Sequence, residues 1–402
     1  MAKEKKQSNS NLLAIIIPVC IAVAVLIGLV ISGRVTANRD KTNPTVTATK
    51  AAVTESQTQS QDTKVTLVAV GDNLIHNTLI DAGKQDDGSL DYSSFYENIS
   101  GYIKSADIAC INQETMLGGS DFDYQGYPLF NTPWEVGEAA VNAGFDVFTC
   151  ATNHSLDVQK FAGIEKECEF FEKHPEVVHI GTNKTEEEYN TITYYEKNGI
   201  KFALLNYTYG TNGISVPEDK PWCVDMLDED KVKADLKTAR ANADCVIVFP
   251  HWGTENSHEI NDLQKKYVKI FSDGGADIVI GTHPHVLQPV EWVTNEATGK
   301  KMIVYYSIGN FISHQTNLNQ MCGGMAELTV ERVDGKVHVT SAKLAPVVDF
   351  YHNTGNGYRF SVYRLSDYTD DIASDQAKDG ASVKYFTDLS KEIIGEEFLD
   401  LN

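Results

Sequence analysis

The sequence VTLVAVGD at residues 65–72 is a short apolar run of strand character that ends at Asp72, a residue able to bind a metal. Four later runs have the same form. They lead to Glu114, to Asn153 and His154, to His251, and to the tripeptide His283-Pro284-His285. Ligands of open α/β sheets gather at the carboxyl ends of the strands, so these positions can converge on one site. The pattern predicts a binuclear metal centre.

The order of strand-like and helical patterns indicates the fold class. Helical patterns lie between the runs of strand character, at 73–83, 93–104, 134–143, 161–173, 229–242 and 259–273. From residue 287 to residue 345 the chain is mostly of strand character, and a short helical pattern follows at 383–398. Alternating β and α followed by mostly β predicts an α/β fold, with a mixed sheet or two stacked sheets covered by helices.

Composition limits the classes of function. The 402 residues are 42% hydrophobic, which fits one large globular domain plus additional segments. The formal net charge is −22. A surface this acidic repels the phosphates of nucleic acids, so we expect no nucleic-acid partner. The seven cysteines form no Cys-x-x-Cys pair, so neither a zinc ribbon nor a disulfide scaffold is expected.

Residues 12–32 form an almost wholly apolar segment. As a helix it would be about 30 Å long, enough to cross the hydrocarbon core of a bilayer. The alternative is a cleaved signal peptide, but the apolar region of such a peptide is usually about 7–15 residues long. We therefore expect an uncleaved signal anchor, through which the chain has the cell membrane as a partner.

Lysines before this segment set its expected orientation. Lys3, Lys5 and Lys6 favour a cytoplasmic tail of residues 1–11. Residues 33–63 are rich in Thr, Ala, Ser, Gln and Lys and contain no aromatic residue, so we expect a disordered linker. The large remaining part of the chain would then lie outside the cell membrane.

The tripeptide His283-Pro284-His285 is the most specific local signal. Pro284 favours extended backbone at the residue before it, and residues two apart in an extended chain point to one face. Both imidazoles would then face one metal site; the alternative is a turn that carries two unrelated surface histidines. Asp72 and Glu114 supply anionic oxygens, although an isolated acid after a strand is often a helix cap.

The remaining candidates combine a ligand with a proton donor. Asn153 can bind a metal through its carbonyl oxygen, while His154 stays free to donate a proton and Asp157 fixes its tautomer. The alternative is a helix cap at Asn153 beside an exposed His154. His251 is either a metal ligand or a core histidine held by a backbone group.

Imidazole and carboxylate ligands favour divalent transition metals such as Mn, Zn or Fe. Two such ions about 3.5–4 Å apart activate water and clamp an in-line displacement, typically at phosphorus. No Walker-type glycine-rich phosphate loop and no Gly-x-Ser-x-Gly elbow occurs in the chain. Serine hydrolysis is therefore not indicated.

Six motifs occur along the chain in a fixed order. They are Gly71-Asp72, Asn112-x-Glu114, Asn153-His154-x-x-Asp157, His251-Trp252-Gly253-x-Glu255, Gly281-x-His283-Pro284-His285-Val286 and Ser307-Ile308-Gly309-Asn310-Phe311. Together they resemble the CapA capsule-synthesis family, which is associated with poly-γ-glutamate biosynthesis. The resemblance implies a divergent calcineurin-like metallophosphoesterase, a four-layer α/β/β/α sandwich over 64–350 and a C-terminal extension at 351–402. It also implies a membrane-anchored, extracytoplasmic protein of a bacterium.

The same motifs imply roles for single residues. The metal ligands would be Asp72, Glu114, Asn153, His251, His283 and His285. His154 would be the acid that faces the leaving group, oriented by Asp157. The related phosphoesterases usually have a His two residues after the first Asp. In this chain that position is Leu74, so one metal would lack a ligand unless His76 takes the place of that His.

Two functions from different classes follow. The first is a metal-dependent hydrolase or transferase that acts at the cell surface on an anionic polymer or its precursor. The second is a non-catalytic membrane component that organises polymer synthesis or export together with other membrane proteins of that process. The set Asn153-His154-x-x-Asp157 favours chemistry, because a scaffold has no need of a positioned proton donor.

Overall fold

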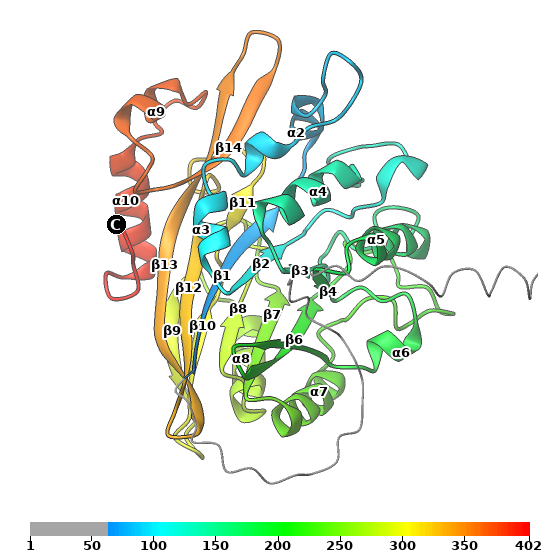
Figure 1. Ribbon diagram of the computed structural model, residues 1–402, viewed down its shortest axis with the longest axis vertical. Coiled ribbons are helices and arrows are strands. Elements are labelled where there is room, and N and C mark those ends of the chain that lie inside the picture. Colours follow the sequence, from blue (N-terminus) through cyan, green and yellow to red (C-terminus); the bar gives the residue numbers. More distant parts are fainter. Residues whose placement is uncertain (1–62) are drawn as a thin grey trace, which may run out of the picture. The chain divides into compact units, whose positions relative to one another are not determined.

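The computed structural model describes residues 63–402, which form two β-sheets with helices (Figure 1). The predicted mixed α/β fold with two sheets is confirmed. The predicted cytoplasmic tail, membrane anchor and nearly all of the predicted linker lie outside the described residues. Among the helices that are described, none is both long and apolar enough to cross a membrane.

The first sheet has eight strands in the order β14-β13-β12-β1-β2-β3-β4, with β11 also paired to β1. Their bounds are β1 Thr63–Asn73, β2 Ile108–Asn112, β3 Val147–Thr149, β4 Val178–Ile180, β11 Asn310–Ile312, β12 Cys322–Val333, β13 Lys336–Asn353 and β14 Tyr358–Arg364. Strands β1 to β4 are mutually parallel, so their carboxyl ends meet at one edge of the sheet.

The second sheet has six strands in the order β5-β6-β7-β8-β10-β9. Their bounds are β5 Thr193–Lys197, β6 Ile200–Thr208, β7 Cys245–His251, β8 Ile278–Ile280, β9 Val290–Thr294 and β10 Lys301–Tyr305. The four central strands are parallel, and β5 and β9 form antiparallel edges. Here too the carboxyl ends of the central strands lie together.

Side-chain alternation in the second sheet shows how the layers are built. Leu204 and Ile247 belong to the core cluster that contains the strands of the first sheet, because they point toward that sheet. Their neighbours Leu205 and Val248 point the other way and pack with two helices. Those helices are α7 (Glu229–Asn242) and α8 (Asp262–Asp273). They cover the outer face of the second sheet.

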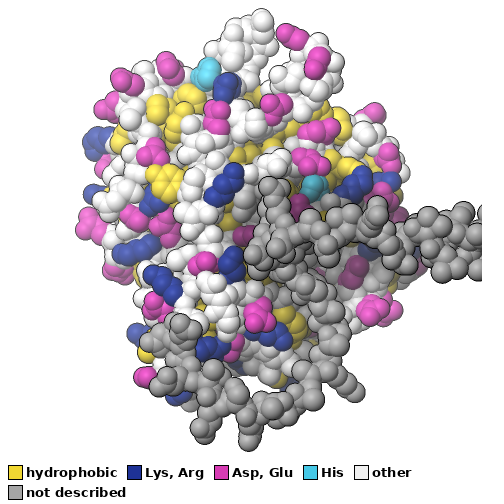
Figure 2. Space-filling model, viewed as in Figure 1, with side chains coloured by type: hydrophobic (Ala, Val, Ile, Leu, Met, Phe, Trp, Pro, Cys, Tyr) yellow, Lys and Arg dark blue, Asp and Glu magenta, His cyan; other side chains and the backbone are white. Residues whose placement is uncertain are grey.

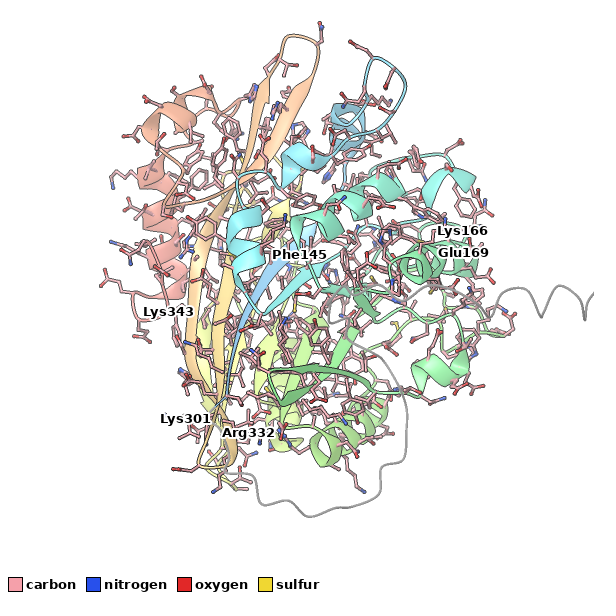
Figure 3. The ribbon with its side chains drawn as sticks, in the orientation of Figure 1. Phe145, Lys166, Glu169, Lys301, Arg332 and Lys343 are labelled. Carbon is pink, nitrogen blue, oxygen red and sulfur yellow. The ribbon has the colours of Figure 1, made fainter. Side chains whose placement is uncertain are left out.

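Polar bonds also join the two sheets. Tyr305 Oη in β10 donates to the Lys343 carbonyl oxygen in β13 at 2.8 Å. Arg332 in β12, labelled with Lys343 in Figure 3, donates to Asp244 Oδ2 at 2.8 Å, just before β7. On the other side, Phe148 of β3 packs on Phe171 of α5, so helices cover the first sheet as well.

Helices from several parts of the chain cover the first sheet. They are α2 (Asn77–Ala82), α3 (Ser100–Ser105), α4 (Trp134–Ala143), α5 (Phe161–Lys173) and α10 (Val383–Ile394), with α6 (Glu186–Tyr189) and α9 (Asp370–Asp375) as further short turns. The predictions at 134–143, 161–173 and 229–242 match α4, α5 and α7 residue for residue. The predicted helix 73–83 is reduced to 77–82, because β1 continues through Asn73 to pair with β11.

The C-terminal segment is joined to the first sheet. The boundary predicted at residue 350 lies inside β13, which continues to Asn353 and pairs with β14. Leu344 in β13 is bridged to Leu399, and α10 lies along this strand (Figure 1). Residues 351–402 thus complete the first sheet and its cover.

Candidate metal centre

The six predicted metal ligands lie together at the carboxyl ends of parallel strands from both sheets. Asp72 is the last residue but one of β1, Glu114 and Asn153 follow β2 and β3, His251 ends β7, and His283 and His285 follow β8. All six are buried, with at most 3% of their surface exposed. The strand-end positions converge because parallel strands place their carboxyl ends on one edge.

These side chains form overlapping groups of possible metal ligands. One group is Glu114, His251 and His283, and another is Asp72, Glu114 and His285. Within each group the candidate ligand atoms lie within 4.8 Å of one another. Glu114 belongs to both, and its Oε1 is 3.8 Å from His251 Nε2 and 3.7 Å from His285 Nε2. Glu114 would therefore be among the ligands of both cations.

Unpartnered buried atoms show that the residues fit metal ions. Neither carboxylate oxygen of Glu114 has a hydrogen-bond partner, and His283 Nδ1 has none either. A buried charge or ring nitrogen without a partner is costly, and most buried polar groups are paired. Divalent cations would satisfy these atoms, and the imidazole and carboxylate donor set suits transition metals.

Asn153 and His251 face the same point. Asn153 Oδ1 lies 2.8 Å from His251 Nε2. His251 Nδ1 lies 2.9 Å from Thr282 Oγ1, so a proton on Nδ1 can be donated to that hydroxyl. This tautomer leaves the lone pair of Nε2 free for a metal beside the amide oxygen. Thr282 was not predicted as a site residue from the sequence.

Asp72 is held by a polar network around the second group. Asn112 Nδ2 donates to Asp72 Oδ1 at 2.9 Å, and His285 Nδ1 lies 3.0 Å from Asp72 Oδ2. Asn310 Oδ1 is 3.1 Å from the same His285 nitrogen. The motifs contained Asn112 and Asn310 but indicated no role for them. The network orients the ring of His285 so that Nε2 points toward Glu114.

The backbone of the His-Pro-His tripeptide is not extended as predicted. His283 has a φ of +98° and His285 a φ of +60°, both in the region that L-residues rarely adopt. The turn is held because the His283 amide lies 3.3 Å from Asp72 Oδ1 and the Pro284 carbonyl accepts from the Asn256 amide at 2.8 Å. Strained backbone of this kind is found where the surrounding structure dictates it, often at functional sites. Both imidazoles still reach the centre.

The predicted proton donor and its partner are in contact. His154 Nδ1 lies 2.6 Å from Asp157 Oδ2, which also accepts from the Phe130 amide at 2.8 Å. With its Nδ1 proton donated to Asp157, His154 keeps Nε2 as its free ring nitrogen. Asn212, which the sequence analysis missed, accepts from Asn153 Nδ2 at 3.2 Å. Its position in an Asn-Gly turn was the only local signal.

Four ligands of the centre, Glu114, His251, His283 and His285, have shifted pKa values. Burial, reinforced by the Asp72 carboxylate, raises the pKa of Glu114 well above its usual value. Burial lowers the pKa of His285, but the Glu114 and Asp72 carboxylates outweigh it and raise that pKa to about 9. Burial and neighbouring imidazoles lower the pKa of His251 and His283 far below the usual value. Those two rings are therefore neutral, the form that binds metal.

His76 does not take the place of a ligand. Its Nδ1 lies 3.2 Å from the His314 amide, and its ring packs on Phe130. Among the described residues, none of the possible ligand groups includes it. Leu74, two residues after Asp72, is buried. The group of Asp72, Glu114 and His285 therefore has three protein ligands on its buried side.

Comparison with known proteins identifies the family. The sequence profile described as "Bacterial capsule synthesis protein PGA_cap" matches residues 66–315. The chain belongs to this family. The matched region includes every predicted site residue, so the centre is part of the PGA_cap region.

Two curated relatives carry related names. The chain is 28% identical over 263 residues to "Capsule biosynthesis protein CapA" of Bacillus anthracis, an alignment covering 63% of this chain and 61% of that protein. It is 31% identical over 172 residues to "PGA biosynthesis protein CapA" of Bacillus subtilis, covering 42% of this chain and 43% of that protein. The chain thus spans less than two thirds of the length of these relatives.

Solved structures similar to the chain include a calcineurin-like phosphoesterase and a putative 5'-nucleotidase. One is the calcineurin-like phosphoesterase YfkN of Bacillus subtilis, 15% identical, with a TM-score of 0.40 over 83% of this chain and 98% of that chain. The other is a putative 5'-nucleotidase from Staphylococcus aureus, 14% identical, with a TM-score of 0.43 over 71% of this chain and 55% of that chain.

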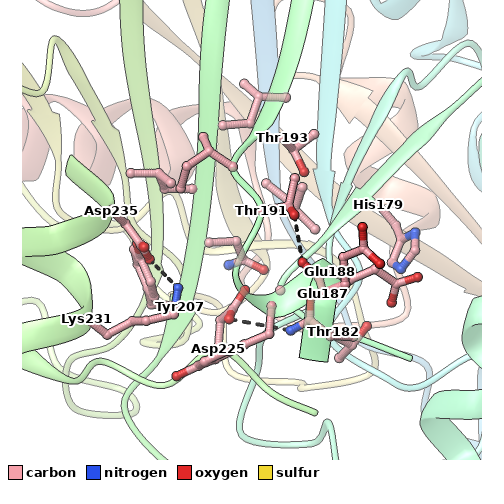
Figure 4. Close-up of a pocket in the computed structure, with 18 of the residues that line it drawn as sticks. His179, Thr182, Glu187, Glu188, Thr191, Thr193, Tyr207, Asp225, Lys231 and Asp235 are labelled. Atoms are coloured by element: carbon pink, nitrogen blue, oxygen red, sulfur yellow. Dashed lines mark hydrogen bonds and ion pairs between the residues drawn. The ribbon is translucent and has the colours of Figure 1, made fainter. Parts of the chain in front are cut away.

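A separate cavity of about 500 Å³ lies between β4, α6, β5 and β6 of this PGA_cap chain (Figure 4). Its polar groups are bonded to one another: Lys231 Nζ is 2.6 Å from Asp235 Oδ2, to which Tyr207 Oη also donates at 2.8 Å. None of the predicted site residues lines this cavity. The volume of this cavity does not by itself indicate a reaction or a ligand. The metal centre is the better candidate site, because it has buried ligand atoms without hydrogen-bond partners.

Proposed function

We propose that the chain is a metal-dependent hydrolase or transferase of capsule or poly-γ-glutamate biosynthesis. In this proposal it is anchored in the membrane and acts outside the cell on a surface polymer or its precursor. The observation that carries the catalytic part is Glu114, buried between two ligand groups with both carboxylate oxygens unpartnered. The names of the two Bacillus relatives support the part in polymer biosynthesis.

The chain offers two overlapping sets of ligands, with Glu114 in both, to two ions. Glu114, Asn153, His251 and His283 would hold one, and Asp72, Glu114 and His285 the other. If bound, two such ions would supply Lewis-acid polarisation of the scissile group and an activated water. A charged or phosphorylated precursor fits this centre because the cations would offset the acidic surroundings.

The residues beside the ligands would supply a proton to the leaving group and hold the proton donor in place. His154 can donate from Nε2 to a leaving group, while Asp157 holds Nδ1 and stabilises the charged ring. Phe130 covers this pair, with its ring centroid 4.7 Å from that of His154. Asn212 fixes the amide of Asn153, so that its oxygen and not its nitrogen faces the ligand group.

The test is the metal content of the purified full chain in detergent. Replacing His283 and His285 together with Ala should remove most of the bound metal, as measured by mass spectrometry. It should also lower the melting temperature in the presence of metal, because metal at 100 times its Kd contributes about 2.7 kcal/mol to the folded state.

The matched control replaces His338 and His352, two histidines of β13 outside the centre. This variant should keep the metal content and the melting temperature of the wild type. Equal metal content in the wild type and in the His283→Ala, His285→Ala double variant would contradict the proposed metal centre.

A further inference from the structure

Glu255 lies on the solvent side of the metal centre. It forms a third possible ligand group with His283 and His285, whose candidate ligand atoms also lie within 4.8 Å of one another. Unlike the other ligands, Glu255 is exposed. Glu114 is buried and is grouped with the imidazoles of His251, His283 and His285. Glu255 is exposed and approaches His283 and His285 from the side that is open to solvent.

The loop that carries Glu255 is fixed to the His-Pro-His turn. The Asn256 amide donates to the Pro284 carbonyl oxygen at 2.8 Å, and Asn256 has a left-handed φ of +62°. Gly253 has a φ of +102°, and a Cβ built there would lie 2.9 Å from Pro284 Cγ. Residues on both sides of Glu255 are thus packed on the turn that presents the two imidazoles.

Glu255 is also free of competing partners. Within residues 63–402, no Lys, Arg or His nitrogen lies within 4.0 Å of its carboxylate, whereas Asp81, Glu229 and Asp273 each pair with a lysine. The nearby Tyr209 ring packs at a tilt against His283, with centroids 4.6 Å apart and 44° between the ring planes, and covers one side of the opening. The basic groups next to the Glu255 carboxylate are therefore the two imidazoles of His283 and His285.

We infer that Glu255 is a metal ligand that closes the solvent side of the centre. Glu255 is grouped with one imidazole of each ligand group, His283 and His285. We assign it to the ion that Asp72, Glu114 and His285 would hold, because that group has three protein ligands and buried Leu74 occupies the position two residues after Asp72. The inference rests on the proposed function, because it requires that the centre holds metal.

The test is a titration of the full chain in detergent, stripped with chelator, with Mn²⁺ or Zn²⁺ alone against a competing chelator. The wild type should bind two ions. Glu255→Gln should weaken one of the two binding steps about tenfold or more, since loss of a carboxylate near a metal typically costs that much affinity. The other step should keep the wild-type constant.

The matched control is Glu259→Gln, an exposed acid four residues further along the same loop that is absent from the ligand groups. It should leave both steps unchanged. Glu255→Ala should behave as Glu255→Gln does, and Glu255→Asp should restore part of the lost affinity.

The outcomes separate the two proposals. If the wild type binds no metal, the proposed function fails. If the wild type binds two ions and Glu255→Gln binds them with the same two constants, the proposed function stands and the role of Glu255 is overturned. Because the side chain is exposed, an unchanged melting temperature of the metal-free variant will show that its fold is intact.

Discussion

Single residues decide whether this centre performs chemistry, and His154 is the most informative of them. Its Nδ1 is engaged by Asp157 at 2.6 Å, and its neighbour Asn153 contacts His251. The side chain is nearly buried, with 6% of its surface exposed, yet it is not needed to complete either metal group. A residue held in this way can be removed without dismantling the metal site.

His154→Ala should therefore lower activity on a generic phosphodiester by about 10²–10⁴-fold, the usual contribution of general acid catalysis. Metal content and melting temperature should stay close to those of the wild type. Asp157→Asn should give a weaker form of the same defect, because it changes only the orientation and charge of the imidazole. Activity and bound metal are measured on the same preparations.

The same variant separates the enzyme from the non-catalytic component. In cells, a scaffold would keep normal polymer output with His154→Ala and lose it only when folding or anchoring fails. Normal polymer levels in a strain that makes the well-folded variant would therefore support the non-catalytic alternative.

At the scale of elements, the centre depends on one close strand contact between β1 and β11. The Asp72 amide donates to the Gly309 carbonyl oxygen at 3.1 Å, and Asp72 pairs with Asn310 across the two strands. A Cβ built at Gly71 would lie 1.8 Å from that same carbonyl oxygen. Only glycine lets β11 approach, and β11 carries the Asn310 side chain that contacts His285.

Gly71→Ala should push β11 away from β1 and destabilise the domain by about 1–3 kcal/mol or more, the usual cost of overpacking. It should also weaken metal binding, because Asn310 would shift from His285. Chemical denaturation and metal titration measure the two effects. Gly101→Ala is the control: a Cβ there meets nothing within 4 Å, so neither quantity should fall. Wild-type stability of Gly71→Ala would show that β11 is not so closely constrained.

At the scale of the whole molecule, charge and topology determine what can reach the centre. The chain carries a net charge of −22, and on the face shown in Figure 2 acidic and basic side chains are interspersed without one continuous basic field. Such a surface does not attract an anionic polymer over a long range. The metal ions would then supply the local positive charge that an anionic substrate needs.

The proposed orientation places residues 64–402 outside the cell. Protease added to intact, wall-stripped cells should cut within residues 33–63 and release a soluble domain, detected by its mass. Lysed cells provide the control, since the same cut should appear there. Protection of the domain in intact cells, with cleavage only after lysis, would reverse the orientation.

Local patterns in the sequence determined the elements and the chemistry of the strand ends. Apolar runs that end at Asp72 or His251 predicted buried strands with ligands at their carboxyl ends, and the helical periods at 134–143 and 229–242 match α4 and α7. The family was predicted from ordered motifs and is confirmed by the matching profile. These features are encoded by residues that are close together in the sequence, so they can be recognised before the three-dimensional structure is known.

Only the tertiary structure decided the conformations and partnerships that long-range contacts impose. The left-handed backbone of His283 and His285 opposes the local preference before and after Pro284, and it is held by Asp72, more than 200 residues earlier in the chain. Strand β11 and the approach of Glu255 to the two imidazoles likewise depend on partners distant in sequence. No local period predicts such features, because their free energy comes from contacts that exist only once both sheets have formed.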